Sequence, residues 1–148
     1  MIVTGRRKDM KEVKKNHRAM KVIGIVLIVL LIPIMIYTAM VLDTNSVMQR
    51  AEQHFSGEIE PNEKDPLSRY NFNANRDQSY HDAKTVKYEL KREFVWHNFK
   101  DGYILIKYDC RYYDENGVLG YGSAGVHAKW MIHKENGEWQ VTKIIEAP

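Results

Sequence analysis

The longest apolar run in the chain extends from Val22 to Leu42 and contains no charged side chain. As an α-helix, these 21 residues would be roughly 31 Å long, which matches the hydrocarbon thickness of a bilayer. Pro33 lies in the middle of the run, where a membrane helix tolerates it. The pattern predicts one transmembrane helix over residues 22–42.

A second helical pattern begins a few residues beyond this run. Ser46 and Gln49 have the spacing of a capping box, and Gly57 is a typical C-terminal stop. The sequence therefore predicts a short amphipathic helix with an apolar face made of Val47, Met48, Ala51 and Phe55.

Residues 58–83 are polar and contain Pro61 and Pro66. A structureless loop of this length is uncommon in a compact domain. We therefore expect a short helix here, with Leu67, Tyr70 and Phe72 lying on the rest of the domain.

From Lys84 onward, the apolar residues alternate with polar ones, which is typical of strands with one buried face. Turns are predicted at Asp101-Gly102, Asn116-Gly117 and Asn136-Gly137. The predicted buried face of the first three strands comprises Val86, Tyr88, Leu90, Phe94 and Trp96, then Ile104, Ile106, Tyr108, Cys110 and Tyr112, then Val126, Ala128, Trp130 and Ile132. The fourth strand is predicted to end with residues 139–145.

The elements together predict an α+β domain, in which a curved four-stranded antiparallel meander wraps the short helix. Gly120, Gly122 and Gly125 in the third strand favour a bulge or bend there. The alternative is close approach of a ligand or a partner backbone to these glycines.

Charge is divided unevenly around the apolar run. Residues 1–21 carry a net charge of +6, whereas residues 43–148 carry −3. Basic flanks stay on the cytoplasmic side of a membrane, so we expect residues 1–21 to be a cytoplasmic tail and residues 43–148 to be one extracytoplasmic domain. A cleaved signal peptide is the alternative, but the run is too long and lacks a small-x-small cleavage site. A mildly acidic domain also argues against nucleic acid as a partner.

The sequence contains few residues that could form a disulfide, a metal site or a catalytic site. The single Cys110 excludes an intramolecular disulfide and is predicted to be core filler, although an exposed thiol could form an intermolecular disulfide. The histidines, among them His97, His127 and His133, have no metal-ligand spacing and are expected on the surface.

Arg92 and Asp109 are the only candidates for acid–base catalysis, and a strand irregularity that exposes Arg92 is the favoured alternative. An inward-pointing Arg92 should have a carboxylate partner. We therefore expect no catalytic residue, no metal and no cofactor, and predict that the chain is not an enzyme; a membrane-tethered enzyme with the same fold is the alternative.

The predicted layout resembles membrane-tethered bacterial members of the cystatin-like, nuclear-transport-factor-like superfamily of α+β rolls. The resemblance rests on the basic tail, the single membrane helix, the helix outside it and the closing hairpin from Trp130 to Ile144. A similar layout occurs in the inner-membrane assembly subunits of type IV secretion and conjugation systems. The resemblance implies a cystatin-like roll at the cell membrane with a scaffolding role, and it implies no catalytic residues.

The second strand has aromatic residues on both faces, and packing accounts for only one of them. We predict that the other face docks a protein partner in a membrane complex; a second copy of the chain is an alternative partner. The candidate docking residues are Tyr103, Leu105, Lys107, Arg111 and Tyr113. The alternative function is a ligand-binding or sensor domain with a pocket between helix and sheet.

Overall fold

The computed structural model describes residues 5–146, with side chains from residue 20 onward. The chain divides into two compact units, residues 1–39 and residues 40–148. The second unit thus begins slightly before the predicted boundary at residue 43, and most side chains of the predicted cytoplasmic tail, residues 1–21, lie outside the described part.

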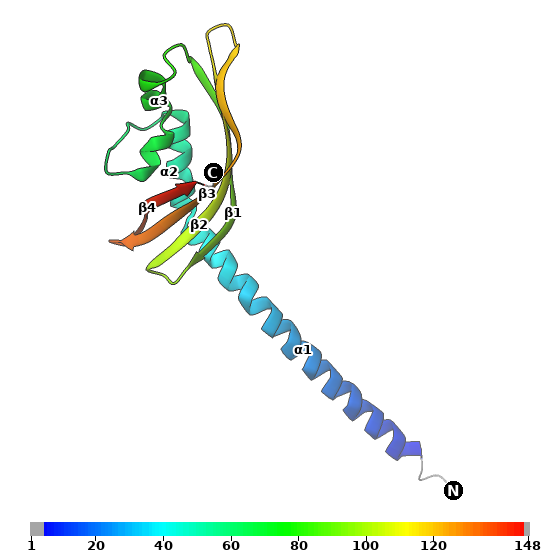
Figure 1. The fold of residues 1–148 in the computed structure, drawn as a ribbon. Coiled ribbons are helices and arrows are strands. Elements are labelled where there is room, and N and C mark those ends of the chain that lie inside the picture. The colour runs from blue at the N-terminus through cyan, green and yellow to red at the C-terminus, as the bar shows by residue number, and fades with distance from the viewer. Residues whose placement is uncertain (1–4, 147–148) are drawn as a thin grey trace. The chain divides into compact units, whose positions relative to one another are not determined.

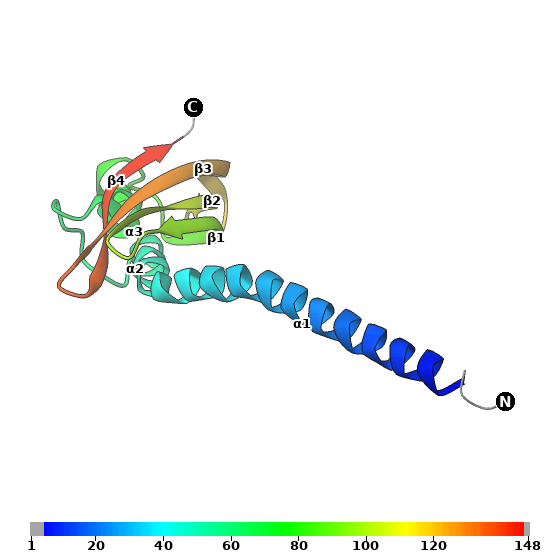
Figure 2. The same cartoon turned by 90° about the horizontal axis from the view of Figure 1, so that it is seen from below.

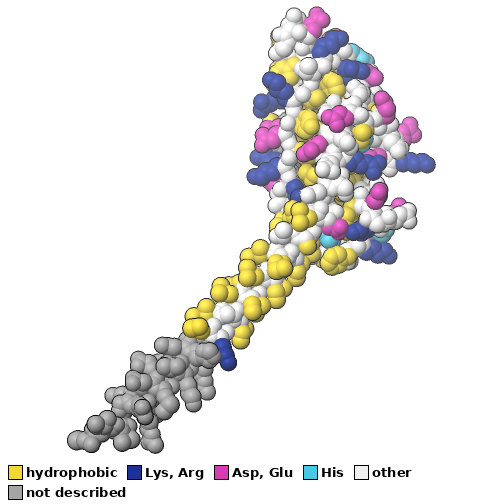
Figure 3. Space-filling view, turned by 180° about the vertical axis from the view of Figure 1, so that it is seen from behind, with side chains coloured by type: hydrophobic (Ala, Val, Ile, Leu, Met, Phe, Trp, Pro, Cys, Tyr) yellow, Lys and Arg dark blue, Asp and Glu magenta, His cyan; other side chains and the backbone are white. Residues whose placement is uncertain are grey.

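Helix α1 (Gly5–Asp43) contains the apolar run and continues through Pro33. From Met20 onward, it is long and apolar enough to cross a membrane. Its large apolar side chains are exposed, whereas the face of the second unit seen in Figure 3 carries charged side chains of both signs. The predicted apolar helix is therefore present.

The second unit is an α+β domain (Figures 1 and 2). Its sheet has the order β1-β2-β3-β4, and all neighbouring strands are antiparallel, which confirms the predicted meander. The helical segments lie together on one face of this sheet. The elements are α2 (Asn45–Ser56), the 3₁₀-helix η1 (Pro66–Tyr70), α3 (Phe72–Gln78), β1 (Thr85–His97), β2 (Asp101–Tyr113), β3 (Leu119–Glu135) and β4 (Glu138–Glu146).

Helix α2 begins two residues earlier than the capping box at Ser46 predicts, because Thr44 and not Ser46 is the N-cap residue. Asn45 is already helical, and the hydroxyl of Thr44 donates back to the carbonyl oxygens of Met40 at 3.0 Å and Val41 at 3.3 Å. The predicted end is correct, since Gly57 adopts the left-handed conformation that suits glycine.

The expected helix between residues 58 and 83 is present as η1 and α3, and Leu67, Tyr70 and Phe72 are all buried. Each segment has a side-chain cap. Asp65 accepts a hydrogen bond from the backbone N–H of Leu67, and Asn71 accepts one from that of Ala74.

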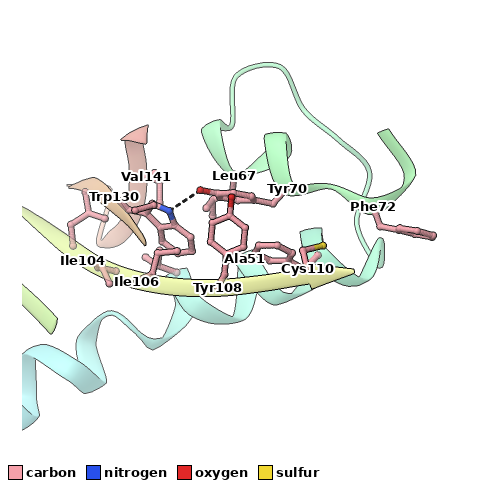
Figure 4. Close-up of a cluster of buried hydrophobic side chains, with 14 of the residues drawn as sticks. Ala51, Leu67, Tyr70, Phe72, Ile104, Ile106, Tyr108, Cys110, Trp130 and Val141 are labelled. Atoms are coloured by element: carbon pink, nitrogen blue, oxygen red, sulfur yellow. Dashed lines mark hydrogen bonds between the residues drawn. The ribbon is translucent and has the colours of Figure 1, made fainter. Parts of the chain in front are cut away.

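One hydrophobic core fills the space between the helices and the sheet. Trp130 is fully buried at its centre, and its indole N–H donates to the hydroxyl of Tyr70 at 3.2 Å (Figure 4). Phe55 of α2 stacks on Tyr70 at 4.9 Å and on Tyr88 at 5.3 Å. The predicted inward residues of β2 are all buried, including Cys110 at 5 % exposure, as expected for core filler.

The prediction for β1 fails beyond Arg92. Arg92 pairs with Ile106, but the next pair is Phe94 with Leu105, so Glu93 is an extra residue in a β-bulge. Phe94 and Trp96, predicted to face the core, therefore face outward. Val95 and His97 take the buried positions.

The first predicted turn is also wrong. The chain reverses at residues 98–100, and Asp101-Gly102 already belongs to β2. Gly102 is buried opposite His97, where a Cβ atom would collide with the Trp96 carbonyl oxygen. The other two predicted turns are correct, with positive φ at Gly117 and at Asn136-Gly137.

The glycines of β3 accompany the expected bulge. The pairing shifts between Tyr108 and Cys110, and Gly125 has a φ of 66° at that shift. Its backbone N–H donates to Asp109 Oδ1 at 2.6 Å.

Candidate functional site

The outer face of the sheet, opposite the helices, carries two neighbouring rows of paired residues that cross all four strands. We call these eight residues the outer patch. The first row consists of Trp96, Tyr103, Met131 and Lys143, and the second of Phe94, Leu105, Lys129 and Ile145. Six of the eight side chains are apolar or aromatic.

The patch is open to solvent and internally ordered. Phe94, Trp96 and Ile145 are 38 %, 46 % and 46 % exposed. The Tyr103 ring lies 6.0 Å from that of Phe94 and 6.1 Å from that of Trp96. The ammonium of Lys129 lies 4.2 Å from the centre of the Tyr103 ring, a cation–π distance.

A shallow groove of about 360 Å³ adjoins the second row. Its apolar wall is formed by Leu105, Ile106, Ala128 and Ile145. Glu93 and His127, 3.2 Å apart, lie at its rim. The groove therefore extends the apolar surface of the patch and gives it a polar border.

The structure divides the predicted docking residues. Tyr103 and Leu105 belong to the outer patch, and Lys107 lies in the adjacent row between Lys91 and His127. Arg111 and Tyr113 lie at the other end of β2, where Tyr113 has the Lys87 ammonium 5.1 Å from its ring centre. Arg111 and Tyr113 therefore lie on the same strand as the outer patch but are not part of it.

Sequence reasoning missed Phe94 and Trp96, which contribute two of the patch's aromatic rings. If the side chains of β1 alternated without interruption between the two faces of the sheet, both rings would face the core. The signal that could have located the bulge is Arg92, because a charged residue on an apolar face indicates an irregular register.

A smaller cavity of about 180 Å³ lies beneath the inner face of the sheet. Glu146 at its edge accepts hydrogen bonds from Tyr70 at 3.1 Å and Tyr108 at 3.0 Å, and it pairs with Arg69 at 3.1 Å. Burial is the main cause that raises the pKa of both tyrosines, and the neighbouring Glu146 raises them further. These phenols are therefore hydrogen-bond donors, not bases.

A second polar cluster joins α2 to the following loop. Asp65 Oδ2 lies 3.0 Å from His54 Nε2 and 2.9 Å from Arg50 Nε, and His54 is 1 % exposed. Asn71 Nδ2 lies 3.3 Å from the other ring nitrogen of His54 and donates to the Ile59 carbonyl oxygen at 2.7 Å. Because both nitrogens of His54 have neighbours within the fold, the cluster holds structure together and presents no free base.

The two catalytic candidates are not brought together. Arg92 points inward and donates to Val41 O at 2.9 Å, Thr44 Oγ1 at 3.0 Å and Asn45 Oδ1 at 2.9 Å, where it links β1 to the start of α2. Asp109 lies on the opposite face and binds the Gly125 N–H. The favoured exposure of Arg92 is therefore wrong, although the predicted irregularity follows it directly.

The remaining candidates for chemistry, Cys110 and His97, are both buried in the domain. Burial raises the pKa of the Cys110 thiol, which makes it a poor nucleophile. His97, expected on the surface, is 1 % exposed because of the bulge. Among the described residues, no group of three His, Cys, Asp or Glu side chains could hold a metal ion.

No protein-family model matches the chain, and no characterised protein matches it in sequence.

Proposed function

We propose that the chain is a single-pass membrane protein whose folded domain lies outside the cytoplasm and docks a protein partner on the outer patch. The partner belongs to a membrane complex of which this chain is an assembly or accessory component. The observation that carries the proposal is the alignment of six apolar side chains in two adjacent cross-strand rows, on the face of the sheet opposite the described helices α2, η1 and α3.

The composition of the patch supports protein docking. Aromatic residues and methionine are enriched at the centres of protein interfaces. Exposed apolar residues are common on protein surfaces when they are scattered singly, whereas a contiguous group of them marks an interaction site. The Lys129 and Lys143 ammonium groups add positive charge, so the complementary surface should be apolar with acidic groups.

The proposed anchor is α1. Its apolar run supports a membrane span, and the net charge of +6 on residues 1–21 supports a cytoplasmic N-terminus. The cell membrane is then the location of the protein.

We propose further that the domain is a cystatin-like roll. In support of this, Val47, Ala51 and Phe55 of α2 belong to the same buried cluster as the inner face of the sheet. The resemblance to tethered scaffold subunits of secretion and conjugation systems rests on the basic tail, the single membrane helix, the helix outside it and the closing hairpin, and it agrees with an accessory role.

The inner cavity is a weaker basis for function than the patch. Drug-sized ligands occupy cavities of about 300–1,000 Å³, whereas this cavity measures about 180 Å³. Its tyrosine hydroxyls and Glu146 already bond to one another. We therefore prefer protein docking to ligand binding.

Site-specific crosslinking in the native membrane tests the proposal. A photoreactive phenylalanine analogue replaces Leu105 or Tyr103 in the patch, and Arg111 on the same face of the same strand serves as the matched control. We expect one discrete protein adduct from both patch positions and none from Arg111. An added Phe94→Ser substitution should weaken the adduct.

Absence of an adduct at both patch positions, or equal adducts at Arg111, would contradict docking on the outer patch. An adduct that consists of two copies of the chain would identify the partner as a second copy.

A further inference from the structure

We propose that the turn between β1 and β2, with Phe99 at its tip and Lys100 beside it, inserts into the interfacial layer of the membrane that α1 crosses. This inference rests on the anchor part of the proposed function and is independent of the outer patch. The occupant of this surface is lipid, both headgroups and the first methylenes of the acyl chains.

Phe99 is an outlier in both exposure and backbone conformation. Its side chain is 69 % exposed, the highest value among the large hydrophobic residues of the described domain. Its φ is 70°, a region that glycine occupies at Gly57, Gly117, Gly125 and Gly137. A phenylalanine that is strained and exposed gives little to folding, which points to a function for the ring.

The length of the apolar run places the start of the domain near the bilayer. Residues 22–39 would span about 27 Å as a helix, slightly less than a hydrocarbon core of about 30 Å. The domain begins at Met40, so no linker separates it from the span. Asp43 must therefore lie at the membrane surface.

The turn is tied to Asp43 through a short series of contacts. His97 Nε2 lies 3.8 Å from Asp43 Oδ2, and His97 Nδ1 accepts the backbone N–H of Phe99 at 3.2 Å. The rings of His97 and Phe99 are 5.4 Å apart. Asp43 is held in turn by Trp139 Nε1 at 2.8 Å and by Lys134 Nζ at 3.0 Å. Phe99 is thus two contacts away from the residue that ends the span.

The side chains at this end of the domain suit a membrane interface. Aromatic rings are enriched at the level of the headgroups, and lysines extend their ammonium groups to the phosphates. Phe99 and Lys100 are both exposed here. The opposite end of the sheet also has an exposed apolar turn, at Val118, but among the described residues no hydrogen bond or ring contact ties that turn to Asp43.

Spin-label accessibility of the full chain tests the proposal in liposomes of phosphatidylcholine and phosphatidylglycerol. Cys110→Ala removes the native thiol, and a single cysteine then replaces Lys100, Val118 or Ile32. Val118, 60 % exposed at the opposite turn, is the matched control. The Ile32 label reports separately whether α1 crosses the bilayer.

We expect the label at position 100 to collide more with lipid-soluble oxygen than with a water-soluble nickel chelate, and the label at position 118 to show the reverse. Adding Phe99→Gly, which suits the positive φ, should keep the fold and lower the oxygen preference at position 100 severalfold. Equal accessibility at positions 100 and 118, with a lipid-exposed label at position 32, would overturn the inference and leave the anchor intact.

Discussion

Asp65 shows how one buried carboxylate organises a segment that has little apolar surface of its own. Its two oxygens bind the Leu67 N–H, His54 and Arg50, so that the cap of η1 is also the bond from the loop to α2. Burial opposes ionisation, but these donors outweigh it and lower the pKa of Asp65. The loop after α2 is therefore held by polar contacts.

Replacement of this carboxylate should destabilise the domain. We expect Asp65→Ala to lower the free energy of unfolding by about 2 kcal/mol, because it leaves a buried His54 and a helix end unpaired. Asp77→Ala, which removes an exposed ion pair with Arg76, should change it by less than about 0.5 kcal/mol. Urea titration in detergent, followed by tryptophan fluorescence, measures both; equal values would show that the Asp65 cluster is not stabilising.

The β-bulge at Glu93 is the element-level feature that creates the candidate site. One extra residue in β1 turns Phe94 and Trp96 outward and brings Val95 and His97 into the core. The outer patch therefore depends on a change of register in the strand.

The bulge residue itself should be dispensable. Deleting Glu93 would leave Arg92 paired with Ile106 and Phe94 with Leu105, so every later side chain keeps its face. We expect this deletion to retain the fold at a cost of about 1 kcal/mol, with Trp96 still open to iodide quenching.

Deleting Val95 is the matched control. It would drive Trp96 into the core position and His97 outward, so we expect the domain not to fold. Equal tolerance of the two deletions, measured by thermal unfolding and iodide quenching, would refute the register argument.

Sequence patterns predicted the meander, the inner face of β2 and the two Asn-Gly turns, because these depend on local periodicity and on residues suited to positive φ. They did not predict the outward position of Trp96, because the expected irregularity was one that exposes Arg92, whereas the bulge follows Arg92 and reverses the faces of the later residues. The Asp101-Gly102 pair matches the sequence pattern of a turn but lies in β2. Its glycine is required there by close packing against the Trp96 carbonyl oxygen. The two β2 residues of the outer patch, Tyr103 and Leu105, were therefore among the predicted docking residues, whereas the two from β1, Phe94 and Trp96, were predicted to be buried.

At the scale of the molecule, the domain combines a lowered carboxylate pKa with raised phenol pKa values. Stability due to Asp65 is present above the pKa of an unfolded aspartate, about 4, and is lost as the pH falls through the lower folded value. Burial raises the pKa of Tyr70, Tyr108 and Tyr112, so stability due to them is present below about pH 10 and is lost as the pH rises further.

We expect the urea midpoint of the full chain in detergent to fall below about pH 4 and above about pH 10. Tyr108→Phe should flatten the alkaline fall, because it removes one phenol that only the unfolded chain can ionise readily. Tyr113→Phe, on the outer face, is the control and should leave the fall unchanged. An alkaline limb that is identical in wild type and Tyr108→Phe would contradict the assignment.

The bonds between the first and last elements of the domain constrain the order in which it can form. Asp43 and Arg50 bind Trp139 and Gln140 of β4, and Tyr70 binds Glu146. During synthesis from the N-terminus, the apolar face of α2 therefore has no complete partner until β4 has been made. The apolar face of α2 is therefore the part of the nascent domain most exposed to aggregation during that interval.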